Sequence, residues 1–85
     1  MEIADWRVRI DALDRQLAEL LQQRCRCALE IGVLKRGGGL PVTESDREAQ
    51  VLANAMHTAP GPLSPDRLRR IFSVIIEQMR AAQRY

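Results

Sequence analysis

The sequence predicts an all-α fold, in which residues 1–85 form one domain of three helices with a very long first helix. Apolar residues recur at spacings of three and four in each predicted helix, which is the period of one helix face. Glycine and proline cluster between these segments, where they end helices and form turns. No segment shows the strict alternation of apolar and polar residues that is typical of a strand, and no internal repeat is visible.

The first helix is predicted over residues 4–36, which contain no proline and no glycine before Gly32. At ~1.5 Å per residue it is about 50 Å long, which exceeds the diameter of a compact globule of this size. The remaining residues cannot cover such a helix, so the sequence predicts a homodimer in which the first helices pair. An apolar stripe runs along this helix and continues in register through one arginine: Ile3, Trp6, Ile10, Leu13, Leu17, Leu20, Arg24, Cys27, Ile31 and Leu34.

A glycine-rich connector ends the first helix. Three glycines occupy positions 37–39, and Pro41 indicates that the helix does not continue. No strand precedes the glycines and no Lys-Ser/Thr follows them, so they predict a flexible connector rather than a phosphate-binding loop.

The two later helices have recognisable start signals. Ser45 is predicted to cap a second helix that runs to about His57, with Glu48 completing a capping box. Ser64 is predicted to cap the third helix, and Pro65 takes its first position. The predicted inward residues are Val51, Leu52 and Ala55 in the second helix, and Leu68, Ile71, Phe72, Ile75, Met79 and Ala82 in the third.

The composition argues against several classes of partner. A net charge of +2, with basic residues interleaved with acidic ones, does not predict nucleic-acid binding. No stretch reaches the ~20 apolar residues of a membrane span and no signal peptide is visible, so we expect a cytoplasmic protein without membrane contact. Cys25 and Cys27 are too close for a helix to bridge, and His57 is the one histidine. We therefore expect neither a metal nor a cofactor.

Four cations lie on or beside the apolar stripe or open the second helix: Arg7, Arg24, Lys35 and Arg47. A half-buried cation is costly unless an anion meets it, so this pattern predicts a site for a small, multiply charged anion. Arg24 and Lys35 are about three turns and ~16 Å apart on one side of the helix, whereas Arg7 is ~25 Å from Arg24. Arg7 can therefore join the site only from a partner chain. The alternative is that these side chains cover the stripe, with Arg24 pairing Glu19 or Glu30 across an interface.

Several spaced elements together resemble the pattern of a known family. An arginine precedes an Ile-Asp-x-(Leu/Ile)-Asp run near the N-terminus. Leu-Leu-Gln-Gln-Arg24, Glu-Ile-Gly-x-x-Lys35 and Pro41-Val-x-x-x-x-Arg47-Glu48 follow, and Ile-Ile-Glu77 precedes Gln83. Their order and spacing resemble the all-helical chorismate mutases, over essentially the whole chain. In that family, found alone or fused to prephenate dehydratase or dehydrogenase, two chains intertwine through the first helix.

The resemblance implies an isomerase that converts chorismate to prephenate by a [3,3] (Claisen) rearrangement, in the biosynthesis of phenylalanine and tyrosine. It implies that Arg7 of the partner subunit, Arg24 and Lys35 bind the two carboxylates of the substrate, with Arg47 adding to them. Arginine suits this task because its planar guanidinium donates two parallel hydrogen bonds to a carboxylate.

The resemblance also assigns the remaining site residues. Lys35 and Gln83 are implied to bond the ether oxygen, while Glu48 and the backbone near Glu44 are implied to hold the ring hydroxyl. Glu44 replaces an aspartate that is frequent there. Met79 stands where the family often has a serine, and a thioether cannot donate a hydrogen bond to the ring carboxylate.

Two other functions stay open at this point. An isochorismate pyruvate lyase has the same fold and a similar set of cations, although the Arg47-Glu48 pair favours the mutase. A helical dimerisation or regulatory module without activity is the other alternative.

Overall fold

A computed structural model describes residues 1–40, 44–58 and 60–83. These residues form three α-helices, α1 (Ile3–Gly37), α2 (Ser45–His57) and α3 (Pro65–Gln83), and no strand occurs among them. The predicted all-α fold with a very long first helix is confirmed, and the bounds of α1 differ from the prediction by one residue at each end. The proline predicted to stop the first helix, Pro41, lies outside the described residues.

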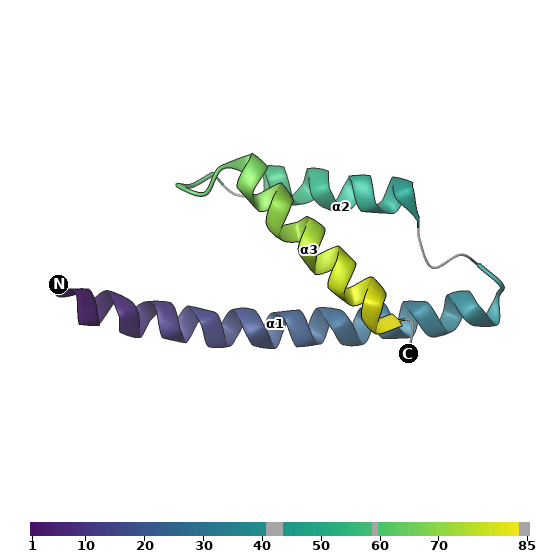
Figure 1. Cartoon of the computed structure of the whole chain (residues 1–85), viewed down its shortest axis with the longest axis horizontal. Coiled ribbons are helices and arrows are strands. Elements are labelled where there is room, and N and C mark those ends of the chain that lie inside the picture. Colours follow the sequence, from purple (N-terminus) through teal and green to yellow (C-terminus); the bar gives the residue numbers. More distant parts are fainter. Residues whose placement is uncertain (41–43, 59, 84–85) are drawn as a thin grey trace.

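The long helix α1 gives the chain its extended shape (Figure 1). The chain measures 55 Å along its longest axis, and its radius of gyration is 15.8 Å. A compact domain of this length has a radius of gyration of about 12 Å. At the end of α1 the Gly38 N–H donates to the Leu34 carbonyl at 3.1 Å, and Gly39 takes a positive φ of 70° that favours glycine. The predicted break after the first helix is therefore confirmed.

The two shorter helices start in different ways. Ser64 caps α3 as predicted, because its Oγ accepts a hydrogen bond from the Arg67 N–H at 3.2 Å. The capping box predicted for α2 is wrong. Ser45 is the first helical residue, and Glu44 is the N-cap without a side-chain capping bond. The Glu48 carboxylate instead forms an ion pair with Arg80 of α3, so a contact between helices replaces the local one.

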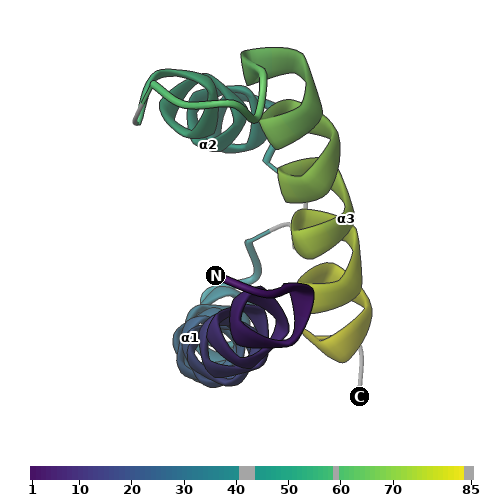
Figure 2. The same cartoon turned by 90° about the vertical axis from the view of Figure 1, so that its left-hand side faces the viewer.

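Helix α3 connects the other two helices. It crosses from α2 to α1 and packs against both, while α1 and α2 do not pack against each other in the described part of the chain (Figures 1 and 2). The predicted inward residues of α2 are buried or half-buried, as are those of α3 except Ile71. Ile71 is 46% exposed, so the prediction that it points inward is wrong for the single chain. Among the described residues, those that are buried are Gly32, Ala55, Met79 and Gln83.

One face of α1 has no cover within the single chain. The N-terminal half of α1 extends beyond α3 (Figure 1), and its apolar stripe from Ile3 to Leu20 is more than half exposed at every position, from 51% at Trp6 to 69% at Ile3. A contiguous exposed apolar surface of this kind marks an interface. This exposure fits the predicted pairing of first helices, which stays a prediction.

Candidate active site

A pocket of about 250 Å³ lies where the C-terminal end of α3 meets α1 and the start of α2. All three helices line it, and its lining includes seven of the eight site residues predicted from the sequence: Arg24, Lys35, Glu44, Arg47, Glu48, Met79 and Gln83. Arg7 does not line the pocket. It lies seventeen positions before Arg24 in a continuous helix, hence ~25 Å away, which is beyond the reach of its side chain.

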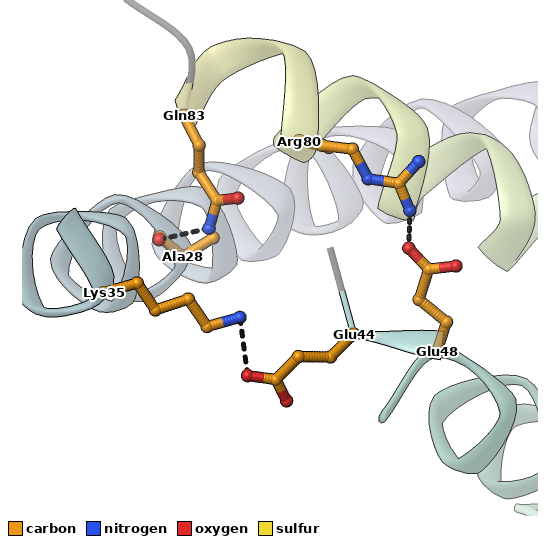
Figure 3. A network of polar contacts seen from close by, with 6 residues as sticks. All are labelled: Ala28, Lys35, Glu44, Glu48, Arg80 and Gln83. Carbon is orange, nitrogen blue, oxygen red and sulfur yellow. Dashed lines mark hydrogen bonds and ion pairs between the residues drawn. The ribbon is translucent and has the colours of Figure 1, made fainter. Parts of the chain in front are cut away.

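Lys35 brings an ammonium group from α1 to the pocket. Its side chain is only 14% exposed, and its Nζ lies 2.9 Å from Glu44 Oε1 at the N-terminus of α2 (Figure 3). The pair joins the end of α1 to the start of α2. A mostly buried ammonium beside a more exposed carboxylate is well placed to interact with a second anionic group in the pocket.

Gln83 enters the pocket from the last turn of α3. The residue is buried, with 8% of its surface exposed, and its Nε2 donates to the Ala28 carbonyl of α1 at 2.6 Å (Figure 3). An amide nitrogen carries two hydrogens, so this bond orients the group and leaves one N–H for another acceptor.

Two residues that the sequence analysis did not assign hold Gln83 in place. Arg36 Nη1 donates to the backbone carbonyl oxygen of Gln83 at 2.7 Å, which satisfies an acceptor at the C-terminus of α3. Gly32 lets the helices approach closely, because a Cβ there would lie 3.2 Å from Gln83 Cγ. A glycine inside a helix destabilises it by ~1 kcal/mol relative to alanine, so its presence usually has a packing reason. The glycine at position 32 is therefore the sequence signal that could have indicated this close contact.

Arg24 and Met79 meet inside the pocket. Arg24 Nη1 lies 2.7 Å from the Met79 sulfur, which acts as a weak acceptor, and Met79 is buried. Within one chain Arg24 therefore contacts Met79 and forms no ion pair with Glu19 or Glu30 among the described residues. The thioether holds the guanidinium without neutralising it, so its charge remains available to an anion.

The pocket has an excess of positive charge. Arg24, Lys35, Arg47 and Arg80 are four cations, and Glu44 and Glu48 are two carboxylates, which leaves a formal excess of two positive charges. Arg80 pairs with Glu48 (Figure 3) and was not assigned from the sequence, because its place in the pocket depends on how α3 packs. Arg47 is exposed and donates to Gln50 Oε1 at 2.7 Å.

Other kinds of chemistry find little support among the described residues. No group of three or more His, Cys, Asp and Glu side chains there could hold a metal ion. Cys25 and Cys27 are both free thiols. None of the helices in residues 1–40, 44–58 and 60–83 combines the length and apolar character needed to cross a membrane.

Comparisons with known proteins agree with this arrangement. Residues 6–84 match the family described as chorismate mutase type II, and the chain belongs to this family. It is 34% identical over 82 residues to a bifunctional chorismate mutase/prephenate dehydratase of Stutzerimonas stutzeri, a match that covers 91% of this chain and 22% of that protein. It is 36% identical over 73 residues to a 4-amino-4-deoxychorismate mutase of Streptomyces pristinaespiralis, covering 85% of this chain and 57% of that protein.

A solved structure matches over nearly its full length. The form II structure of chorismate mutase from Thermus thermophilus has a TM-score of 0.93 and 30% sequence identity, over 96% of this chain and 93% of that chain. The three-helix fold and the predicted family resemblance are therefore confirmed. The chain spans 22% of the length of the bifunctional relatives that it matches.

Proposed function

We propose that this chain is a chorismate mutase, an isomerase that rearranges chorismate to prephenate in the biosynthesis of phenylalanine and tyrosine. The observation that supports this most directly is the pocket of about 250 Å³ with a formal excess of two positive charges. Chorismate is a dicarboxylate, and a pocket with excess positive charge attracts its two negative charges. Family membership over residues 6–84 supports the same substrate.

The reaction explains why the pocket has cations rather than a nucleophile or a base. A [3,3] rearrangement transfers no proton, so the enzyme contributes by restraining a flexible substrate and by placing charge where the transition state becomes polar. The carbon–oxygen bond breaks ahead of carbon–carbon bond formation, and negative charge develops on the ether oxygen. The Lys35 ammonium and the second Gln83 N–H stabilise that oxygen more in the transition state than in the substrate.

The remaining residues bind and orient the substrate. Arg24 and Arg47, with Arg7 of the partner subunit, bind the two carboxylates through guanidinium forks. Glu48 accepts a hydrogen bond from the ring hydroxyl. Met79 lines the pocket, and its sulfur contacts Arg24 Nη1 at 2.7 Å. It takes the position at which a hydroxyl side chain would donate a hydrogen bond to the substrate.

We further propose that the enzyme is an intertwined homodimer in the cytoplasm. A second copy of the chain would cover the apolar stripe of α1, which is more than half exposed from Ile3 to Leu20. Antiparallel pairing of the two α1 helices would bring Arg7 of each chain to the pocket of the other. Each dimer would then have two active sites shared between its subunits.

The direct test is to add the purified chain to chorismate and follow the loss of chorismate absorbance, with prephenate identified as the product. Isochorismate is the second substrate, because its cleavage to pyruvate would instead indicate a lyase. Lys35→Ala is the inactive control. A folded dimer that leaves chorismate unchanged would refute the proposal and support a dimerisation module without activity.

A further inference from the structure

Arg80, which pairs with Glu48, is a charged group of the pocket to which the proposed reaction assigns no role. Arg80 comes from α3 and Glu48 from α2, and both line the pocket. Their side chains are 25% and 32% exposed, so solvent screens the pair less than it screens a pair on the open surface. Figure 3 shows the guanidinium of Arg80 directed at the carboxylate of Glu48.

This pairing changes what Glu48 can recognise. The Arg80 guanidinium pairs with Glu48 Oε1. A carboxylate has a second oxygen, and in our proposal this oxygen accepts the hydrogen bond from the ligand. A hydroxyl group needs only that acceptor. An ammonium group would also gain from the negative charge of a carboxylate, but Arg80 has neutralised this charge and would repel the incoming cation.

We propose that Arg80 is a specificity-determining residue, which makes the pocket select a ring hydroxyl over a ring ammonium at the position that faces Glu48. The inference rests on the proposed function, in which Glu48 accepts a hydrogen bond from that hydroxyl. Arg80 acts through Glu48 and does not touch the reacting atoms, so it is a positioning residue. Selection arises because the charge pattern disfavours the competing substrate and leaves the hydroxyl substrate unaffected.

The test compares two substrates that differ at this group, chorismate and 4-amino-4-deoxychorismate, whose amine is protonated at neutral pH. The measured quantity is the kcat/KM for the amino substrate divided by the kcat/KM for chorismate. Replacing Arg80 by a neutral residue, in Arg80→Gln and independently in Arg80→Met, should raise this ratio by about tenfold or more, because a nearby positive charge is removed. Arg80→Lys keeps the charge and should keep the ratio of the unmodified enzyme.

A matched control lies on the same helix. Arg70 forms an exposed ion pair with Asp66, outside the pocket, so Arg70→Gln makes the same chemical change without altering the ratio. Combining Arg80→Gln with Glu48→Gln should change the ratio less than Arg80→Gln does alone. The double variant has no carboxylate at position 48 whose negative charge could attract the ammonium group of the amino substrate. Circular dichroism and sedimentation would verify that each variant is folded and has the same assembly state.

Each result decides between the proposals. A raised ratio in both neutral variants, with Arg80→Lys and Arg70→Gln unchanged, supports the inference. An active enzyme whose ratio stays constant in the neutral variants would overturn it while leaving the proposed function intact. A proportional loss of activity on both substrates would show that Arg80 binds a carboxylate they share, and would also overturn it. A folded chain that converts neither substrate would refute the proposed function and this inference together.

Discussion

Replacing the Gln83 amide by a carboxyl group, in the variant Gln83→Glu, should make the activity depend on pH. One N–H of the amide bonds the Ala28 carbonyl at 2.6 Å, and we assign the other to the ether oxygen of the substrate. Both donors are present at any pH. A protonated carboxyl group has one O–H and an ionised one has none, so the number of donors falls in two steps.

The size of each step follows from these contacts. In acid, the single O–H can serve either Ala28 or the ether oxygen, and the loss of one hydrogen bond costs about 1 kcal/mol, or about fivefold in rate. On ionisation the remaining donor disappears and the carboxylate repels the developing oxyanion. A missing donor of this kind typically lowers the rate by ~10²–10³.

The pH of the transition should lie above the ordinary pKa of ~4.3 for a glutamate side chain. Position 83 is only 8% exposed, and burial raises the pKa of a carboxyl group. The Ala28 carbonyl, 2.6 Å from the present amide nitrogen, would add to this effect because it favours a protonated partner. The Lys35 ammonium acts in the opposite direction, but Glu44 already pairs with it at 2.9 Å.

The assay is the pH profile of kcat for Gln83→Glu, measured from about one unit above that reference pKa to mildly alkaline conditions. Gln78→Glu is the matched control, since Gln78 is an exposed glutamine on the same helix. Stability gives an independent readout. Burial raises the pKa of the introduced carboxyl group in the folded state above its value in the unfolded state. The protonated carboxyl group therefore makes its full contribution to the free energy of unfolding below the unfolded-state pKa, and this contribution is lost as the pH rises through the folded-state pKa. The deficit in Tm relative to the unmodified chain should therefore widen with pH for Gln83→Glu only.

A flat profile at full activity would show that position 83 does not contact the reacting oxygen. The part of the site on α3 would then be wrong. Lys35→Ala provides a contrast, because no proton can replace the missing ammonium. Its activity should be lower still and should not recover in acid.

Three further predictions concern the assembly and the positioning of Gln83. Sedimentation should show a dimer, because the α1 stripe is exposed in one chain; a folded, helical monomer at micromolar concentration would contradict this. Arg7→Ala and Arg24→Ala should each be nearly inactive, and mixing them should restore one intact site in each mixed dimer. No recovery despite demonstrated subunit exchange would show that Arg7 does not act from the partner. Gly32→Ala places a Cβ 3.2 Å from Gln83 Cγ and should lower kcat, while the free energy of unfolding changes by less than ~1 kcal/mol because alanine favours the helix. An unchanged kcat would show that Gly32 does not set the position of Gln83.

The sequence alone determined the helices and most of the candidate site. Helix formation depends on residues within about four positions, so periodicity and caps such as Ser64-Pro65 were sufficient to place all three helices. The cost of cations along an apolar stripe pointed to an anion, and family resemblance extended the set to Gln83. The reach of a straight helix was also enough to separate Arg7 from the pocket of its own chain.

The tertiary structure decided which of these side chains meet and what restrains them. Gln83 bonds Ala28 across 55 positions of sequence, and Arg36 bonds the Gln83 carbonyl across 47. Such contacts depend on the angle and depth at which α3 packs on α1, which no local pattern encodes. The same packing brought Arg80 to Glu48 and overrode the predicted capping box of α2. Contacts between residues distant in sequence form only once the helices are packed. These contacts determine which partner each charged side chain of the pocket faces.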